Sequence, residues 1–239
     1  FLSKYLEKNQ NNLSNIKKSI LPVLGIIFLF FGLIMLEPDF GTGMVIVLSL
    51  MLILFISGVK IKFFASLGIL GILGIAGLII IAPYRLKRII SFLNPWSDPL
   101  GSGYQIIQSL YAIGPASLLG LGFGKSIQKQ FYLPEPQTDF IFAIICEEFG
   151  LVGAISVIVL FISLFYIILK ISLKQSNLFA KYLSFGLGMQ IILQGALNLC
   201  VVTSLIPVTG VTLPFFSYGG SSLLVSMISV GIILNICGS

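Results

Sequence analysis

The chain has 239 residues, of which 57% are hydrophobic and 9% are charged. A soluble globular domain has roughly 45–50% apolar and about 25% charged residues, so this composition indicates a membrane protein. The net charge is +6 and histidine is absent, which excludes Ser-His-Asp and Cys-His nucleophiles and leaves acid-base chemistry to carboxylates, lysines or tyrosines.

The chain begins with a polar, charged stretch, "KYLEKNQNNLSNIKK", ahead of its first apolar run. Residues 1–18 are predicted to form a cytoplasmic segment. Because the first residue is Phe1 and this stretch does not look like a cleaved signal peptide, we expect a fragment of a longer protein.

Six apolar stretches follow that are long enough, or nearly so, to cross a bilayer, whose hydrocarbon core of about 30 Å needs about 20 apolar residues in a helix. The predicted fold class is therefore all-α, a polytopic membrane protein with six transmembrane helices and a large extracytoplasmic loop. The predicted transmembrane helices cover residues 19–36, 43–59, 63–83, 150–169, 182–206 and 218–237. The predicted divisions after residue 18 are 19–83 with three helices, a loop at 84–138 with an interfacial helix, and 139–239 with three helices and a loop at 207–218.

The basic residues orient these helices, because short cytoplasmic segments collect lysine and arginine. Under this topology nine lysines share one side with a single acidic residue, Glu7, so we expect both ends of the chain in the cytoplasm. The positive charge then reflects topology, and no nucleic-acid partner is expected. The other side receives the remaining seven acidic residues and five basic ones, namely Arg85, Lys87, Arg88, Lys125 and Lys129.

The first part of the outer loop, "YRLKRIISFLNPW", places Leu86, Ile89, Ile90 and Leu93 at helical spacing. This pattern predicts an amphipathic helix at the membrane interface that ends at Pro95. The cations of this helix have two interpretations. They either anchor it to lipid headgroups or bind an anionic ligand on the outer face.

Glycines gather further along the loop, around "GLGFGKS", at positions 114, 120, 122 and 124. A Walker nucleotide loop would need another glycine where Leu119 stands, so we reject that motif. We expect these glycines to form tight backbone turns beside a ligand, followed by Lys125 and Lys129.

Four of the eight acidic residues lie close together beside very apolar sequence, at Glu135, Asp139, Glu147 and Glu148. Asp139 follows Thr138 where a helix would begin, so a helix cap is one interpretation of it. Residues 151–169 already provide nineteen uncharged positions for the bilayer core, which puts residues 139–149 at or above its outer boundary. Asp139 would then stand at the mouth of a protein-walled cavity, and the two later glutamates would pair with a cation or hydroxyl from another helix.

The last outer loop, "IPVTGVTLPFFSYGGSS", is rich in proline, glycine and hydroxyl groups, including those of Ser217 and Tyr218. Such backbone is tolerated near a membrane only where protein or a water-filled cavity satisfies its polar groups. We therefore expect this loop to form another wall of the cavity at Asp139.

Three segments, "PWSDPLGSGYQIIQSLYAIG", "QKQFYLPEPQTDFIFAIICEEFG" and "PVTGVTLPFFSYGGSS", resemble the SEDS family of shape, elongation, division and sporulation proteins, most closely its FtsW/SpoVE branch rather than RodA. The resemblance covers roughly residues 35–225. Family members have about ten transmembrane helices, which implies that four precede this chain. The segment "LEPDFGTG" also matches, except that Glu37 stands where the family usually has glutamine; Asp39 beside it is expected to be structural or supporting.

The resemblance implies a peptidoglycan glycosyltransferase that polymerises lipid II into a growing glycan strand. The implied partners are a class B penicillin-binding transpeptidase and other division proteins. The implied location is the bacterial cytoplasmic membrane, with the active site on the extracytoplasmic face. The essential carboxylate of the family lies in its TDF motif, which here is Asp139, the expected base for the acceptor sugar hydroxyl.

The remaining expected roles follow from this assignment. We expect the pyrophosphate and sugars to be bound by Arg85, Lys87, Arg88, Lys125, Lys129, Gln137, Thr138, Ser217 and Tyr218. Glu147 and Glu148 are expected to be structural. The sequence establishes no cofactor, and a divalent ion, Mg²⁺ or Mn²⁺, held by Asp139 stays open as an alternative.

Two other functions compete with polymerisation: a lipid II flippase, and a non-enzymatic scaffold that recruits the transpeptidase. A flippase predicts ionisable groups distributed through the bilayer. The predicted helices are instead nearly free of charge, and the acidic residues gather at one face, which favours chemistry at the membrane surface.

Overall fold

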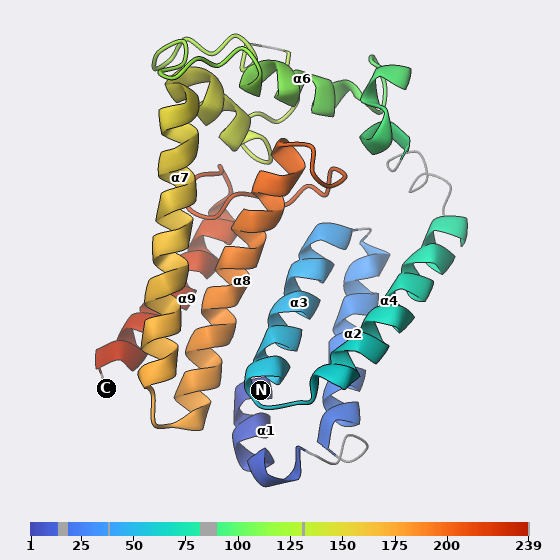
Figure 1. Ribbon diagram of the computed structural model, residues 1–239, viewed down its shortest axis with the longest axis vertical. Helices are drawn as coiled ribbons and strands as arrows, with labels where there is room; N and C mark the ends of the chain where they lie inside the picture. Colours follow the sequence, from blue (N-terminus) through green and yellow to red (C-terminus); the bar gives the residue numbers. More distant parts are fainter. Residues whose placement is uncertain (14–18, 38, 82–89, 131, 239) are drawn as a thin grey trace. The chain divides into compact units, whose positions relative to one another are not determined.

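The computed structural model of the protein describes residues 1–13, 19–37, 39–81, 90–130 and 132–238 (Figure 1). Every regular element in these ranges is a helix, so the all-α prediction is confirmed for them. Helices occupy all six predicted apolar stretches: α2 (Leu21–Leu36), α3 (Phe40–Ile56), α4 (Ile61–Ile81), α7 (Ile141–Lys174), α8 (Leu178–Val202) and α9 (Gly220–Gly238).

Three of these helices, α7, α8 and α9, are long and apolar enough to cross a membrane by themselves. Helices α2 and α3 are apolar but shorter, and so is the stretch Ile61–Gly74 of α4. A topology with six membrane-spanning helices therefore stays a prediction.

Four further short helices have both ends in the described ranges: α1 (Leu2–Lys8), η1 (Gln10–Asn12), η3 (Pro95–Ser97) and α6 (Tyr104–Ile113). Sequence reasoning missed α1 and α6. The inner face of α6 is buried, and the Ser109 hydroxyl donates a 2.7 Å hydrogen bond to the carbonyl of Val202 at the end of α8. The long outer loop thus folds onto the helices.

The predicted interfacial helix is described only over its last turn. Residues 90–93 are helical, and the N–H of Asn94 closes the turn on the carbonyl of Ile90 at 2.9 Å. The helix ends before Pro95, as predicted, since a proline favours extended backbone in the residue before it. Arg85, Lys87 and Arg88 lie outside the described residues.

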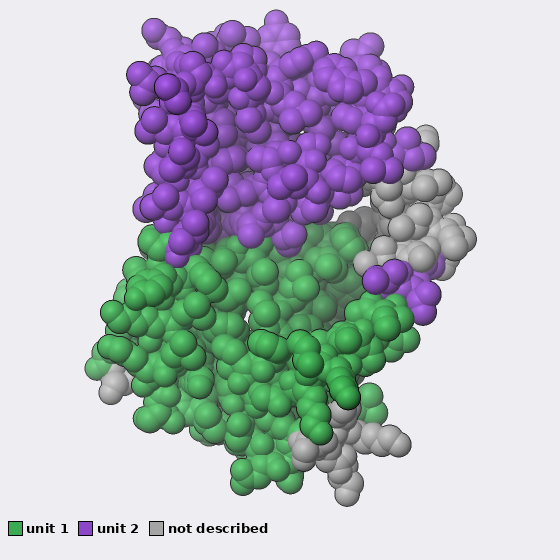
Figure 2. Space-filling model, viewed as in Figure 1, with its two compact units in different colours: residues 1–70, 163–193, 224–239 green, residues 71–162, 194–223 purple. Residues whose placement is uncertain are grey.

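The chain divides into two compact units (Figure 2). Unit 1 comprises residues 1–70, 163–193 and 224–239, and unit 2 comprises residues 71–162 and 194–223. All of the described residues predicted to act on substrate belong to unit 2.

Unit 1 is built on α2 and α3, which pack against each other. Its core includes Leu6, Leu54 and Tyr182, all almost fully buried. The Tyr182 hydroxyl donates to Oε1 of Gln10 at 2.8 Å. Asp39 is the N-cap of α3, where its carboxylate accepts a 3.0 Å hydrogen bond from the N–H of Thr42.

In unit 2, α7 is interrupted at Gly150, whose φ of 62° and ψ of −152° are not helical. A Cβ atom at Gly150 would lie 2.2 Å from the carbonyl oxygen of Ser117, and one at Gly120 would lie 2.5 Å from that of Glu148. Backbone approach this close requires glycine at both positions. The segment upstream of the break carries the acidic residues, and Leu151 begins the uncharged helix.

The loop segment 117–122 supplies the hydrogen bonds that the break removes from α7. Two bonds join it to each side of the break, so it joins the two parts of the helix. The four bonds run from Leu121 N–H to Glu147 O at 2.9 Å, Gly122 N–H to Glu148 O at 2.9 Å, Leu151 N–H to Ser117 O at 3.2 Å and Val152 N–H to Leu118 O at 3.2 Å.

Candidate functional site

The turn that precedes α7 carries Asp139, and three consecutive carbonyl groups hold it in place. The carbonyl of Gln137 accepts from the N–H of Tyr218 at 2.8 Å. That of Thr138 accepts from the Ser217 hydroxyl at 2.5 Å. The third, of Asp139 itself, accepts from the side-chain amide of Asn198 at 2.7 Å.

Asn198 connects this turn to the last outer loop. Its side chain is fully buried in α8, and its amide group donates a second hydrogen bond of 2.7 Å to the carbonyl of Val211. Because a buried side-chain amide has few rotamers that satisfy two acceptors at once, Asn198 fixes the distance between the Asp139 turn and the loop. Sequence reasoning missed this residue, whose signal is a polar amide within the apolar stretch "ALNLCVV".

The Asp139 side chain is half-buried beside the same loop. A Cβ atom at Gly210 would lie 3.5 Å from Oδ2 of Asp139, and the φ of Gly210 is +76°. The carboxylate therefore lies next to loop backbone that carries no side chain. In the left-handed conformation of Gly210, another residue would be strained.

The last outer loop is itself anchored in unit 2. The Gln194 side chain of α8 donates to the carbonyl and the hydroxyl of Thr212, both at 3.1 Å, and Ser217 accepts from the N–H of Leu213 at 2.7 Å. Ser217 therefore holds two backbone segments together. The Tyr218 side chain is 79% exposed, so its hydroxyl is accessible to a ligand.

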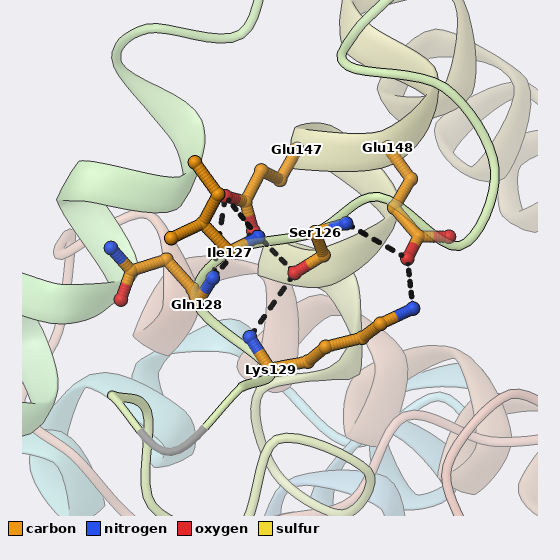
Figure 3. A network of polar contacts seen from close by, with 6 residues as sticks. All are labelled: Ser126, Ile127, Gln128, Lys129, Glu147 and Glu148. Carbon is orange, nitrogen blue, oxygen red and sulfur yellow. Dashed lines mark hydrogen bonds and ion pairs between the residues drawn. The ribbon is translucent and has the colours of Figure 1, made fainter.

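A second polar cluster lies on α7 at Glu147 and Glu148, about two helical turns beyond Asp139 (Figure 3). The carboxylate of Glu147, which is buried, accepts from the Ser126 hydroxyl at 2.5 Å and from the N–H groups of Ile127 at 3.0 Å and Gln128 at 3.2 Å. Its neighbour Glu148, also buried, accepts from the N–H of Ser126 at 3.4 Å. The hydroxyl predicted as a partner of these glutamates thus comes from the loop before α7.

The predicted cations have different environments. Lys129 forms a 2.5 Å ion pair with Glu148, with its side chain still 36% exposed. Lys125 is exposed and follows the glycine turns. Of those glycines, Gly120, Gly122 and Gly124 have positive φ, whereas Gly114 ends α6 in the right-handed region, with a φ of −60°.

The structure thus brings Gln137, Thr138, Asp139, Ser217 and Tyr218 together in one region of unit 2. Lys129, Glu147 and Glu148 gather in the second cluster, and Asp39 caps a helix of unit 1. Among the described residues, no three of histidine, cysteine, aspartate and glutamate come close enough to hold a metal ion.

Comparison with known proteins decides the family of this chain. All of its residues, 1–239, match the family of cell cycle proteins that comprises FtsW, RodA and SpoVE. The chain belongs to this family. The predicted resemblance is therefore confirmed, and the chain is part of a multi-pass membrane protein.

Curated members of the family cover almost the whole chain. Stage V sporulation protein E of Bacillus subtilis is 50% identical over 236 residues, which are 99% of this chain and 64% of that protein. A probable peptidoglycan glycosyltransferase FtsW of Coxiella burnetii is 42% identical over 239 residues, again 99% of this chain and 64% of that protein. The chain thus spans about 64% of the length of these relatives.

Solved structures of the family share this fold. One chain of a peptidoglycan synthase complex, described as coordinating polymerization and crosslinking, matches with a TM-score of 0.78 and 30% identity, covering 99% of this chain and 66% of that one. The rod shape determining protein RodA of Thermus thermophilus matches with a TM-score of 0.63 and 25% identity, covering 99% and 62%.

Proposed function

We propose that the protein containing this chain is a peptidoglycan glycosyltransferase that polymerises lipid II into glycan strands, during cell division or sporulation. Its relatives named as probable peptidoglycan glycosyltransferases and its likeness to a peptidoglycan synthase complex support this activity. The observation that carries the proposal is the Asp139 turn, fixed through three carbonyl groups with its carboxylate beside the last outer loop.

In the proposed reaction Asp139 is the general base. The acceptor sugar hydroxyl loses its proton to the Asp139 carboxylate as its oxygen attacks the anomeric carbon of the donor. The bond from that carbon to the pyrophosphate oxygen breaks, and the polyprenyl pyrophosphate leaves with the electron pair. Attack from the face opposite the leaving group inverts the anomeric centre, as in inverting glycosidases.

Positioning is the main contribution of the surrounding residues. A general base is effective only within hydrogen-bond reach of the proton that it takes, and small misplacements reduce the rate strongly. The bonds from Tyr218, Ser217 and Asn198 fix the backbone of the turn at three successive residues. We assign Gln137, Thr138, Ser217 and Tyr218 to the acceptor side of the site for this reason.

Cations on the same side of the membrane would stabilise the pyrophosphate that leaves. We assign this role to Arg85, Lys87, Arg88 and Lys125. Lys129 is a weaker candidate because Glu148 already neutralises it. A divalent ion at Asp139 is the alternative, and its other ligands would be backbone, hydroxyl or substrate oxygens, which Mg²⁺ accepts.

The proposed setting is the bacterial cytoplasmic membrane, with Asp139 on its extracytoplasmic face. The proposed partners are a class B penicillin-binding transpeptidase and other division proteins. The resemblance to a peptidoglycan synthase complex supports the first of these partners.

Polymerisation of labelled lipid II by the full-length protein with its transpeptidase partner tests the proposal. Asp139→Asn should abolish the glycan product and leave folding and lipid II binding intact, whereas Glu135→Gln, at an exposed position of the same segment, should polymerise normally. Normal polymerisation by Asp139→Asn would remove this residue from the mechanism.

Two further measurements separate the competing functions. Translocation of lipid II across vesicles by the wild-type protein, without polymerisation, would favour a flippase. Complementation of a deletion strain by Asp139→Asn would favour a scaffold that only recruits the transpeptidase.

A further inference from the structure

The loop that joins the two parts of α7 is unusually apolar on its exposed side. Leu118, Leu119 and Phe123 are 69%, 74% and 82% exposed, respectively, and Ile127 is 56% exposed. We call residues 117–127 the apolar loop. Clustered exposed side chains of this size indicate contact with a partner or a membrane.

The hydrogen bonds at the helix break fix the level of the apolar loop along α7. The carbonyls of Ser117 and Leu118 accept from the N–H groups of Leu151 and Val152. These two residues begin the uncharged run 151–169, which is followed by Lys170. A helix of nineteen residues is about 28 Å long, so it needs its whole length to cross a core of about 30 Å. Leu151 must then lie at the edge of the hydrocarbon core, and the apolar loop lies beside it.

The exposed side of the apolar loop lies next to exposed apolar residues of α7. Leu151, Val152 and Ile155 are 51%, 56% and 50% exposed on the first turns of the uncharged helix. Across the break, the ring of Phe149 contacts that of Phe123, with centroids 5.9 Å apart. One apolar surface therefore extends from the spanning helix onto the loop.

The charge of the apolar loop fits the same environment. Lys125 is exposed next to Phe123, whereas the nearby Glu147 and Glu148 are buried. A lysine beside exposed apolar residues can bury its alkyl chain and place its ammonium group among lipid phosphates. An anionic lipid surface complements this cation.

We propose that the apolar loop inserts into the bilayer leaflet at its end of α7, with Leu118, Leu119 and Phe123 among the acyl chains and Lys125 at the phosphates. The outer loop is then held at two points, by α7 from within and by lipid from outside. This places the second polar cluster, and Lys125 with it, at the level of lipid headgroups. The inference concerns membrane contact and does not depend on the glycosyltransferase reaction.

Spin labels at single introduced cysteines measure the depth directly. The full-length protein is placed in nanodiscs of phosphatidylethanolamine and phosphatidylglycerol, with a label at Leu119→Cys or Phe123→Cys. Ile155→Cys serves as the lipid-facing reference and Glu135→Cys as the water-facing one. Parent protein labelled in parallel gives the background from native thiols, of which Cys237 is exposed.

Labels at positions 119 and 123 should collide more with oxygen, which concentrates in hydrocarbon, than with a water-soluble nickel chelate, as at position 155. At position 135 the label should collide more with the nickel chelate than with oxygen. Lys125→Glu should raise the collision rate of the label at position 123 with the nickel chelate relative to that with oxygen. Lys125→Arg should leave this ratio of collision rates unchanged. The proposal would be overturned if the ratio of oxygen to nickel-chelate collision rates at positions 119 and 123 matched that at position 135.

A protein partner on the apolar loop gives a different result. In the protein alone, the labels at positions 119 and 123 would then collide with oxygen and with the nickel chelate as a water-exposed label does. Both collision rates would fall together only when the transpeptidase is added. That outcome would also overturn the proposal. None of these readouts requires glycosyl transfer, so failure here is distinct from failure of the proposed function.

Discussion

Two groups of carboxylates lie a few residues apart in unit 2, and the fold uses them in opposite ways. The turn at Asp139 is held through its backbone carbonyls, which accept from Tyr218, Ser217 and Asn198. The segment at Glu147 and Glu148 is held through the side chains, which accept from the loop residues before α7. The bonds that join the first group to α8 and the last outer loop run through backbone carbonyls, and those that join the second group to the loop before α7 run through carboxylates.

The atoms that make these bonds distinguish Asp139, the candidate catalytic residue, from Glu147 and Glu148, which have a structural role. A carboxylate whose oxygens already bind loop N–H groups, a hydroxyl or a lysine would have to give up these contacts to reach a substrate hydroxyl, which makes it a poorer candidate for the base. A carboxylate on a turn fixed by other atoms can act without loosening its own support. Four predictions test the comparison, beginning with the largest effect.

The two groups should respond differently to loss of charge. Asp139→Asn should lower polymerisation by about 10²–10⁴-fold or more, the usual contribution of a general base, with little loss of stability. Glu147→Gln should instead lower the free energy of unfolding by about 1.5–3 kcal/mol, because charged hydrogen bonds to the loop are lost. Glycan product on gels and thermal unfolding in detergent measure the two effects. The comparison fails if Glu147→Gln is fully stable yet inactive.

The second prediction concerns the helix break that supports the Glu147 group. Gly150→Ala should lower the free energy of unfolding by about 2–6 kcal/mol, the sum of backbone strain and a clash with the Ser117 carbonyl. Gly124→Ala is the matched control, since its φ is +78° but a Cβ atom there meets nothing within 4 Å. It should cost only the strain, about 1–3 kcal/mol. Equal losses would show that the close approach at Gly150 contributes nothing.

The third prediction concerns the support of the Asp139 turn. Asn198→Ala leaves the carbonyls of Asp139 and Val211 without this donor, which should cost about 1–3 kcal/mol for each carbonyl left unsatisfied. Because Asn198 is fully buried, kcat should fall while KM for lipid II stays unchanged. Gln194→Ala, which releases Thr212 but not the turn, should lower stability without changing kcat. A rise in KM alone for Asn198→Ala would contradict a positioning role.

The smallest effect should come from the two lysines of the loop. Lys129→Gln should lower the free energy of unfolding by about 1 kcal/mol, because the pair with Glu148 is partly exposed at the lysine end. The loss should shrink as salt is added, since salt screens exposed pairs. Lys125→Gln should leave stability unchanged and weaken lipid II binding. A stability loss for Lys125→Gln together with weaker lipid II binding for Lys129→Gln would contradict the roles proposed for these lysines.

Much of the helical architecture could be predicted from the sequence, because hydrophobic length and lysine position determine where a membrane helix begins and ends. The bounds of α2, α3 and α9 lie within a few residues of the predicted stretches. The TDF motif also predicted where α7 begins, because Thr138 and Asp139 directly precede Phe140 and Ile141.

The remaining features depend on contacts between residues far apart in the chain. Gly150 lies in "EEFGLVG", which an ordinary helix would tolerate, and only the loop segment 117–122 makes the break possible. Nothing in the sequence pairs Lys129 with Glu148, or joins Asn198 to two carbonyls in different segments. Helix α6 was missed because it is short and its apolar residues serve a local core.

The interruption of α7 at Gly150 also affects how the helix can tolerate a change in its length. In an uninterrupted α-helix, one inserted or deleted residue rotates everything beyond it by about 100°. Here the segment that leads to Asp139 is held by a loop that is bonded to it at Glu147 and Glu148 and to the rest of α7 at Leu151 and Val152. A residue inserted or deleted at the break would therefore have to disrupt this loop as well as the helix.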